Sequence, residues 1–420
     1  MARGSTRGSS WTWEDWDDGM GEDDDAMITY NPNDPASHRD PFPAYRRLRD
    51  ERPVYRNDEL DFWAVSRHAD VSAAWRDPAG FSSDHGPALE EWAPDAARTA
   101  GFVAMDPPRH THRRRLISQG FTPAAVRRLE PDIRRLTHTH LRPLLDHGGP
   151  FDFTDLAAAI PVDVISELIG VPLPDRPLLQ RLSRQIMTRD DPDGHTTPAM
   201  SQATADMAAY YAALIAERRA RPRDDLVTAL LHAEADGERL ADQDIVATLI
   251  LLGIAGNETT SKLLSTAWRC AWQHPEQRRR VWAGETDVSA WVEETLRYEG
   301  PAQYVARRVT RPTTLHGVVV PAGARILLLV GAANRDERVF PDADRYDLSR
   351  DTGRALAFGL GHHFCLGASL ARLEATTVLR ELVRVVEADY EVDLGAASWA
   401  ASPMRGHSRL PTMVKQRLAF

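Results

Sequence analysis

Apolar residues recur every three or four positions along most of the chain after Pro41, a spacing typical of helices that bury one face. Shorter runs between glycines and prolines predict strands at residues 62–66, 304–310 and 325–330. We therefore expect a mainly α protein with small β-sheets. The clearest helical stretches are residues 122–145, 153–169, 200–221, 242–273, 287–298 and 365–386.

Residues 1–26 lack this period and carry eight acidic residues, two arginines and three tryptophans. A segment so rich in glycine, serine and aspartate buries too little apolar surface to fold, so we expect it to be disordered. It is either an acidic, aromatic docking arm or an unselected leader ahead of a true start at Met27. No linker or internal repeat divides the remainder, and residues 27–420 are expected to form one domain.

The chain has 420 residues, 42% of them hydrophobic, and its 51 basic and 61 acidic residues give a net charge of −10. These values are ordinary for a soluble globular protein. The longest nearly unbroken apolar run, residues 245–256, is shorter than the ~18 residues that predict a membrane span, so we expect no membrane association. The chain has two cysteines, Cys270 and Cys365, and does not open on a signal segment, which favours the cytoplasm.

One of these cysteines lies in the most informative segment, residues 358–367, which read Phe-Gly-Leu-Gly-His-His-Phe-Cys-Leu-Gly. The glycines let this loop pass close to a flat group, and the helical pattern that follows Cys365 places its sulfur near helix amides that favour negative charge. Such surroundings stabilise a thiolate, and a cysteine thiolate can be the axial ligand of haem iron.

Three other interpretations of this loop compete. Gly359-x-Gly361 lacks the third glycine of a dinucleotide-binding loop. A zinc site built on His362, His363 and Cys365 lacks a second ligand cluster. A cysteine–histidine nucleophile pair remains open. It predicts a haem-free, colourless hydrolase that loses its activity when Cys365 is alkylated.

A second candidate segment lies in the middle of the 242–273 helix, where residues 255–260 read Ala-Gly-Asn-Glu-Thr-Thr. Gly253 and Gly256 each cost this helix about 1 kcal/mol relative to alanine, so something should compensate. Either they allow close helix packing, or they make room for a ligand or water beside Glu258 and Thr259. In the second case the acid and the alcohol would deliver protons.

Two further segments carry paired charges. Glu294 and Arg297 are three residues apart on one helix face and can form an ion pair. Asp106 is expected to cap a helix in which His110 and Arg114 share a face. This second segment is rich in arginine, as the chain is throughout: Lys262 and Lys415 are its only lysines, and the other 49 basic residues are arginine. Because the chain is acidic overall and lacks a nucleic-acid motif, we expect no nucleic-acid partner.

Taken together, the four segments resemble the cytochrome P450 family, in the family's order, and the resemblance extends from Asn31 to the C-terminus. The haem-binding signature Phe-x-x-Gly-x-x-x-Cys-x-Gly matches Phe358, Gly361, Cys365 and Gly367. The remaining matches are the oxygen-activation motif at Ala255, Gly256, Glu258 and Thr259, the Glu-x-x-Arg motif at Glu294 and Arg297, and the His-x-x-x-Arg pair at His110 and Arg114. Many members have aspartate where this chain has Glu258.

The resemblance implies the P450 fold, with haem b between a long distal helix and a proximal loop whose Cys365 binds the iron. Phe358 would shield the sulfur, and Arg345 would join Glu294 and Arg297 in a structural set. Arg308 would point away from the site, and His362 carries no implied role. The remaining implied cofactor contacts are His110, Arg114, Arg307, Gly359, His363 and Gly367.

The implied activity is that of a haem-thiolate monooxygenase that uses O₂ to hydroxylate or epoxidise an apolar small molecule. A macrolide or polyketide, terpene or steroid-like intermediate of secondary metabolism fits best, and desaturation, aryl coupling and non-catalytic haem binding remain as alternatives. Electrons would come from ferredoxin and ferredoxin reductase, with Arg113, Arg115, Arg127, Arg128 and Arg372 as candidate docking groups. Candidate polar contacts to the substrate are Glu90, Glu91, Asp95 and His407.

Overall fold

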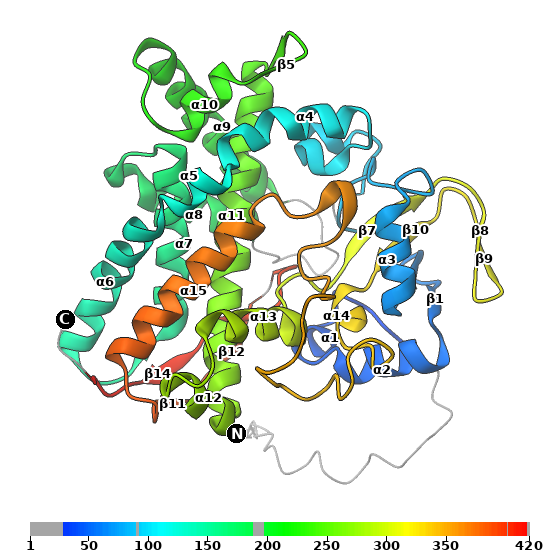
Figure 1. Cartoon of the computed structure of the whole chain (residues 1–420). Helices are drawn as coiled ribbons and strands as arrows, with labels where there is room; N and C mark the ends of the chain where they lie inside the picture. The colour runs from blue at the N-terminus through cyan, green and yellow to red at the C-terminus, as the bar shows by residue number, and fades with distance from the viewer. Residues whose placement is uncertain (1–27, 90–91, 188–196, 401, 418–420) are drawn as a thin grey trace, which may run out of the picture.

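The computed structural model describes residues 28–89, 92–187, 197–400 and 402–417, and the expected acidic leader at 1–26 lies outside them (Figure 1). The helices are α1 (Pro35–Arg39), α2 (Phe42–Glu51), α3 (His68–Arg76), α4 (Arg109–Ser118), α5 (Pro123–Arg127), α6 (Glu130–His147), α7 (Phe153–Ile169), α8 (Arg176–Met187), α9 (Pro198–Ala220), α10 (Leu226–His232), α11 (Asp242–Gln273), α12 (Pro275–Trp282), α13 (Val288–Glu299), α14 (Val330–Ala333) and α15 (Ala368–Val385).

The strands are short. They are β1 (Val54–Asn57), β2 (Phe62–Val65), β3 (Phe81–Ser82), β4 (Phe151–Asp152), β5 (Glu234–Ala235), β6 (Glu238–Arg239), β7 (Val305–Val309), β8 (Thr313–Leu315), β9 (Val318–Val320), β10 (Arg325–Leu328), β11 (Glu391–Val392), β12 (Ser398–Trp399), β13 (His407–Arg409) and β14 (Pro411–Met413). A mainly α protein with small sheets is therefore confirmed.

The long helix α11 is the centre of the helical part of the molecule and packs against α7, α9, α13 and α15. It begins and ends at the residues that the apolar pattern predicted. Near its C-terminal end the buried Trp268 ring stacks between Phe153, at 4.8 Å between ring centroids, and Tyr390, at 3.7 Å. This aromatic stack anchors one end of the helix in the largest apolar cluster.

The main sheet lies beside the helical part, with strand order β1-β2-β10-β7-β3. β10 pairs with β7 antiparallel, so that Ile326 lies opposite Arg307. β3 pairs with β7 on its other side, with Ser82 opposite Arg308. The pairing places β7 beside β3 and the segment that follows β3. Helix α3 contacts the loop that precedes α15.

Most predicted elements appear at or near their predicted bounds, and the differences have local causes. The predicted helix at 122–145 is interrupted between α5 and α6, because Pro131 lies in the first turn of α6, where a proline is tolerated but cannot continue an earlier helix. The last predicted helix begins at Ala368 rather than Cys365. Among the described residues, no helix is long and apolar enough to cross a membrane.

Candidate functional site

The loop that carries Cys365 is held by main-chain hydrogen bonds. The Cys365 N–H donates to the Phe358 carbonyl at 2.9 Å, and the Phe364 N–H donates to that of Gly361 at 3.1 Å. Gly359 and Gly361 have φ angles of +67° and +65°, which favour glycine, and a Cβ at Gly359 would lie 2.8 Å from the Trp75 ring. The loop is therefore pressed against α3 and fixed in one course.

The protein around the Cys365 sulfur acts on its thiol in two opposed ways. The residue is accessible to solvent, yet enough protein surrounds its sulfur to raise the pKa of the thiol. The Gly367 amide and the charges of Arg114 and Arg372 oppose this rise without reversing it. The helix amides thus favour the thiolate as the sequence predicted, but burial of the sulfur outweighs them. A metal cation at the sulfur would supply the missing stabilisation, because coordination deprotonates a thiol.

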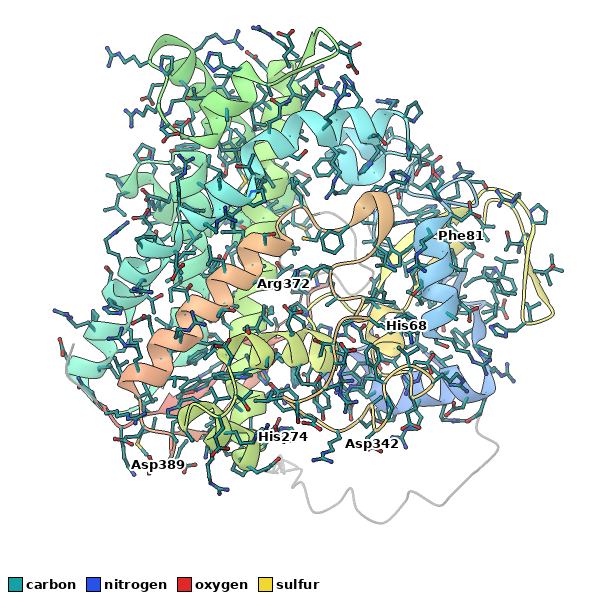
Figure 2. All side chains as sticks on the ribbon, in the orientation of Figure 1. His68, Phe81, His274, Asp342, Arg372 and Asp389 are labelled. Carbon is teal, nitrogen blue, oxygen red and sulfur yellow. The ribbon has the colours of Figure 1, made fainter. Side chains whose placement is uncertain are left out.

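Phe358, expected beside the sulfur, is held by a cation–π contact. The guanidinium of Arg372, which Figure 2 labels, lies 4.4 Å from the centre of the Phe358 ring. It also pairs with Glu293, with 3.1 Å between Nη2 and Oε2. Because the Phe358 carbonyl accepts the Cys365 N–H, this contact fixes the ring and the cysteine backbone together.

His110 is fully buried on α4, and neither ring nitrogen has a hydrogen-bond partner among the described residues. Its ring lies 4.2 Å from that of His363, whose Nε2 lies 3.1 Å from the Ser83 hydroxyl. Burial and the nearby Arg114 lower the pKa of His110 to about 4, and burial and Arg307 lower that of His363 to about 2. Both imidazoles are therefore neutral near pH 7, and one of them keeps its polar atoms free.

Arg307 is a buried cation on β7 with no ion-pair partner among the described residues. Its guanidinium lies 4.7 Å from the centre of the Trp75 ring and donates to the Ala306 carbonyl at 2.8 Å. Burial lowers the pKa of Arg307 to about 10. The neighbouring Arg308 points the other way, as expected, and its Nε donates to Asp84 Oδ1 at 2.9 Å.

An unpaired buried charge is costly, so this group of side chains is built to receive an anion. Arg307, His110 and the half-buried Arg114, which acts electrostatically on both His110 and Cys365, provide charged and neutral donors. The two propionate carboxylates of a haem would satisfy this donor set. The residues present therefore fit the cofactor that the resemblance implies.

Asp106 does not cap α4, which corrects the sequence prediction. The helix begins at Arg109 and has Pro108 at its N-cap, without a side-chain cap. The Asp106 carboxylate instead accepts the Ser83 N–H at 2.9 Å and the Ser82 hydroxyl. This acid therefore ties the segment ahead of His110 to the end of β3, beside Arg307.

At the centre of α11, Ala255 is accessible to solvent, although most residues of the C-terminal half of this helix are buried. The Thr259 hydroxyl donates to the Ala255 carbonyl at 2.7 Å. In the described parts of the chain, no hydrogen bond joins the Glu258 and Thr259 side chains; Glu258 Oε1 instead lies 3.4 Å from Nζ of Lys262. The acid and alcohol are thus adjacent and separately anchored, one by helix backbone and the other by a lysine.

One glycine of α11 is explained by helix packing. A Cβ at Gly253 would lie 2.8 Å from the Tyr211 hydroxyl of α9, closer than real contacts allow. A Cβ at Gly256 would lie 3.4 Å from the Ile165 side chain of α7, which is ordinary van der Waals contact. Close packing therefore accounts for Gly253, and room for a ligand beside Gly256 stays a prediction.

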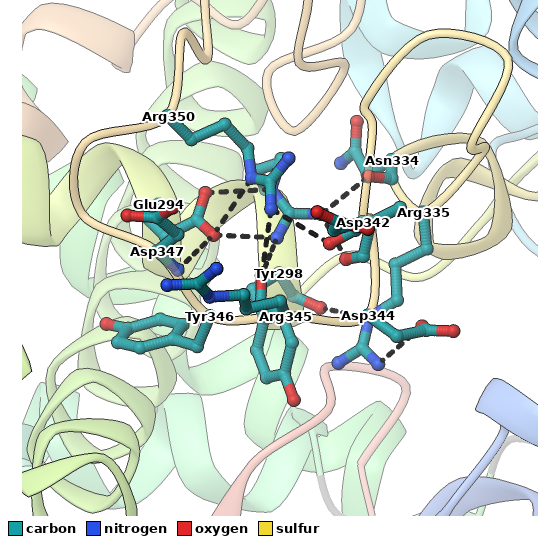
Figure 3. A network of polar contacts seen from close by, with 12 residues as sticks. Glu294, Tyr298, Asn334, Arg335, Asp342, Asp344, Arg345, Tyr346, Asp347 and Arg350 are labelled. Atoms are coloured by element: carbon teal, nitrogen blue, oxygen red, sulfur yellow. Dashed lines mark hydrogen bonds and ion pairs between the residues drawn. The ribbon is translucent and has the colours of Figure 1, made fainter.

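Glu294 and Arg297 form a buried ion pair, with hydrogen bonds of 2.8 and 2.7 Å (Figure 3). The third side chain of this set is Arg350, whose Nε lies 3.3 Å from Glu294 Oε1, and not Arg345 as predicted. Arg345 contributes its main-chain carbonyl, which accepts from Arg297 and Arg350, while its side chain is exposed. Arg345 and Arg350 both follow Glu294 in the same meander, and sequence alone did not distinguish them.

Other predicted residues lie outside this site or are already paired. Four candidate docking arginines each pair with an acid: Arg113 with Asp244, Arg115 with Asp236, Arg128 with Asp224 and Arg372 with Glu293. His407 is buried and stacks on Trp399 at 4.3 Å between ring centroids. Glu90 and Glu91 lie outside the described residues, and Asp95 is exposed.

The structure argues against a zinc site and against a cysteine–histidine nucleophile pair at the Cys365 loop. Within residues 28–89, 92–187, 197–400 and 402–417, no three His, Cys, Asp or Glu side chains are grouped as metal ligands, so a zinc site at His362, His363 and Cys365 lacks its geometry. His363 bonds to Ser83 rather than to the thiol. A nucleophile pair would require an imidazole in hydrogen-bond contact with the sulfur.

Sequence reasoning missed several residues that build this site. No sequence motif identifies Trp75, Ser83 or Arg350, because their contacts join segments far apart in the chain. Lys262 did leave a signal: it follows Glu258 by four residues on a helix and is one of two lysines in the chain.

Comparisons with known proteins point to one family. The family model for cytochrome P450 matches residues 288–391. The putative cytochrome P450 123 of Mycobacterium tuberculosis is 46% identical over 398 residues, which are 94% of this chain and 98% of that protein. The structure of cytochrome P450 CYP109Q5 from Chondromyces apiculatus has a TM-score of 0.85 at 36% identity, covering 94% of this chain and 100% of that one. The erythromycin C-12 hydroxylase of Saccharopolyspora erythraea is 39% identical over 346 residues, 80% of this chain and 84% of that protein.

Proposed function

The chain belongs to the cytochrome P450 family and is a P450 monooxygenase, and on that premise we propose that it binds haem b through Cys365 and hydroxylates or epoxidises an apolar secondary-metabolite intermediate. The observation that carries this proposal is the anion-receiving group beside the Cys365 loop. In the part of the chain that the structure describes, Arg307 is a buried cation without an ion pair, and His110 is a buried imidazole with both nitrogens unpaired.

In this proposal each side chain has a defined task. The sulfur of Cys365 binds the iron, and the loop held by Phe358 and Gly359 fixes its position. The carboxylates of the haem are held by His110, Arg114, Arg307 and His363. Bound haem would supply the iron at which O₂ is reduced and an organic substrate is oxidised.

The residues of α11 would deliver protons for the reaction. Thr259, fixed by its bond to the Ala255 carbonyl, presents a hydroxyl oxygen that can accept a hydrogen bond and pass a proton on. Glu258 is the acid that replenishes the proton at this hydroxyl. Ala255 is small and accessible, which leaves space for the substrate next to the acid and the alcohol.

The substrate class is inferred from relatives and from chemistry. The name of the erythromycin C-12 hydroxylase concerns that enzyme, and its similarity supports a macrolide or polyketide for this chain, ahead of a terpene or steroid. We expect electrons from ferredoxin and ferredoxin reductase in the cytoplasm. The candidate docking arginines that pair with acids would have to exchange those partners for acidic groups of a ferredoxin.

Product analysis under labelled oxygen tests the proposal. Holoenzyme is screened with macrolides and polyketides for substrates that shift the haem absorption spectrum, and these are turned over with ferredoxin, its reductase, NADPH and ¹⁸O₂. The expected product carries one ¹⁸O atom. A product that lacks two hydrogens or is coupled, without ¹⁸O, would instead identify desaturation or aryl coupling. If no compound shifts the spectrum or is oxidised, the proposed substrate class is wrong.

A further inference from the structure

Lys262 is a buried lysine in a chain whose basic residues are otherwise almost all arginine. It lies one turn after Glu258 on α11 and is 8% exposed. Its Nζ lies 3.4 Å from Glu258 Oε1 and donates to the His407 carbonyl at 2.9 Å. The ammonium group is therefore held from two sides, by an acid on its own helix and by the backbone of strand β13.

The loop opposite α11 is shaped around this lysine. A Cβ at Gly406 would lie 2.6, 2.8 and 2.9 Å from Cδ, Cβ and Cγ of Lys262, distances that real Cβ contacts do not reach. The same loop is tied to the body of the protein, because the Arg405 N–H donates to the Pro301 carbonyl at 2.9 Å and Met404 forms a bridge with Ala302. Only glycine at position 406 lets the methylene stem pass and keeps the ammonium at Glu258.

The other charges near Lys262 leave Glu258 as its carboxylate partner. Glu299, the nearby buried acid, is already shared by Arg269 at 2.6 Å and Arg405 at 2.9 Å. The two histidines with which Lys262 interacts electrostatically, His407 and His38, are neutral near pH 7. Burial, assisted by these arginines and by Lys262 itself, lowers the pKa of His407 to about 3, and burial, Arg405 and Lys262 lower that of His38 to about 4.

We propose that Lys262 is a positioning residue that holds the Glu258 carboxylate in the orientation from which it supplies protons to Thr259, a role that rests on the proposed function of that pair. Monooxygenation consumes O₂, two electrons from the redox partner and two protons, and yields oxidised substrate and water. When Glu258 is misplaced, the same two electrons and two protons leave with both oxygen atoms as hydrogen peroxide. Lys262 therefore sets the ratio of oxidised substrate to hydrogen peroxide formed per pair of electrons.

The test compares the two lysines in the holoenzyme. Lys262→Met keeps the length of the stem and removes the charge. We expect product formed per NADPH to fall roughly tenfold and hydrogen peroxide to rise in proportion, with substrate affinity and the spectrum of the reduced carbon monoxide complex unchanged. The matched control is Lys415→Met, because Lys415 is exposed and pairs at 2.6 Å with Asp389, beyond the C-terminal end of α15 (Figure 2). This control should behave as the unmodified enzyme does.

Two further variants separate positioning from a general structural effect. Gly406→Ala displaces the Lys262 stem from the opposite side and should produce the same peroxide leak. Glu258→Gln removes the group through which Lys262 acts, so adding Lys262→Met to it should cause no further loss. Fully additive effects, or an unchanged ratio of product to peroxide in Lys262→Met, would overturn the proposal.

A readout independent of turnover comes from the scarcity of lysine. Protein labelled at lysine Cε gives two side-chain NMR signals, which the two lysine-to-methionine variants assign. Glu258→Gln should move the Lys262 signal and leave that of Lys415 in place; an unmoved Lys262 signal contradicts the proposal whatever the activity. If the unmodified enzyme itself forms no product from O₂, the proposed function fails, while the NMR result still decides whether Lys262 holds Glu258.

Discussion

Single residues at this site lower the stability of the haem-free protein and favour binding of the cofactor. Arg307 is buried over an indole ring without an ion-pair partner among the described residues, and His110 keeps two polar atoms unpaired. Such groups destabilise a protein that has nothing to bind. They become favourable when a carboxylate arrives, because hydrogen bonds to a charged group are among the stronger ones in proteins.

Arg307→Gln should therefore weaken haem binding and strengthen the haem-free protein. A charged hydrogen bond contributes ~1.5–3 kcal/mol, so we expect haem to transfer to apomyoglobin about 10- to 100-fold faster. Unfolding of the haem-free variant by urea should give a free energy at least as high as that of the unmodified chain. Arg308→Gln is the control, because Arg308 already pairs with a carboxylate, that of Asp84. Equal haem-transfer rates in the two variants would contradict the role of Arg307.

At the scale of elements, the meander after α14 is joined to α13 by side chains that sequence motifs only partly identify. Arg350 reaches Glu294 and also donates to the main-chain carbonyls of Pro341, Asp342 and Arg345, whereas the Arg345 side chain is exposed. Arg350 therefore connects the meander to α13 from one side, and Arg297 connects it from the other by donating to the Ala343 and Arg345 carbonyls.

Arg350→Ala should lower the free energy of unfolding by about 2–3 kcal/mol, because it removes several hydrogen bonds around a buried carboxylate. Arg345→Ala should change it by less than about 0.5 kcal/mol, as expected for an exposed side chain. Urea unfolding of both variants measures the difference. The opposite ranking would restore Arg345 as the third member of the set.

Features that depend on neighbouring residues in the chain could be predicted from the sequence, whereas contacts between distant segments could not. The period of apolar residues placed α7 and α11 at their observed bounds, because local spacing determines which face of a helix is buried. Motif resemblance led to the candidate residues around Cys365 and Glu258. What sequence could not provide were contacts between distant segments: Trp75 under Gly359, Tyr211 beside Gly253, and Gly406 around Lys262.

For the whole molecule, buried histidines make stability depend on pH. The folded-state pKa values of His38 and His407 are about 4 and about 3, while an unfolded histidine titrates near 6.5. Above the unfolded pKa both states are neutral and no stability is lost. As the pH falls below ~6.5 the unfolded state binds protons first, so stability declines by up to about 1.4 kcal/mol per pH unit for each histidine.

His407→Phe keeps a ring that can stack on Trp399 and should flatten this decline between pH 6.5 and 5. Urea unfolding across that range measures it, with the same substitution at the exposed His147 as the control. A slope unchanged in His407→Phe would show that the pH dependence arises elsewhere.

The central claim is that Cys365 binds haem iron as a thiolate. The absorption spectrum of the dithionite-reduced, carbon-monoxide-treated protein tests it most directly, because the Soret band reports the iron, its ligand and the charge of the sulfur together. We predict a strongly red-shifted band in the unmodified protein and in Cys270→Ser, whose thiol is buried with its pKa raised to about 12 by that burial, and its loss in Cys365→Ser. A colourless protein, or a band typical of histidine or neutral-thiol ligation, would contradict the account.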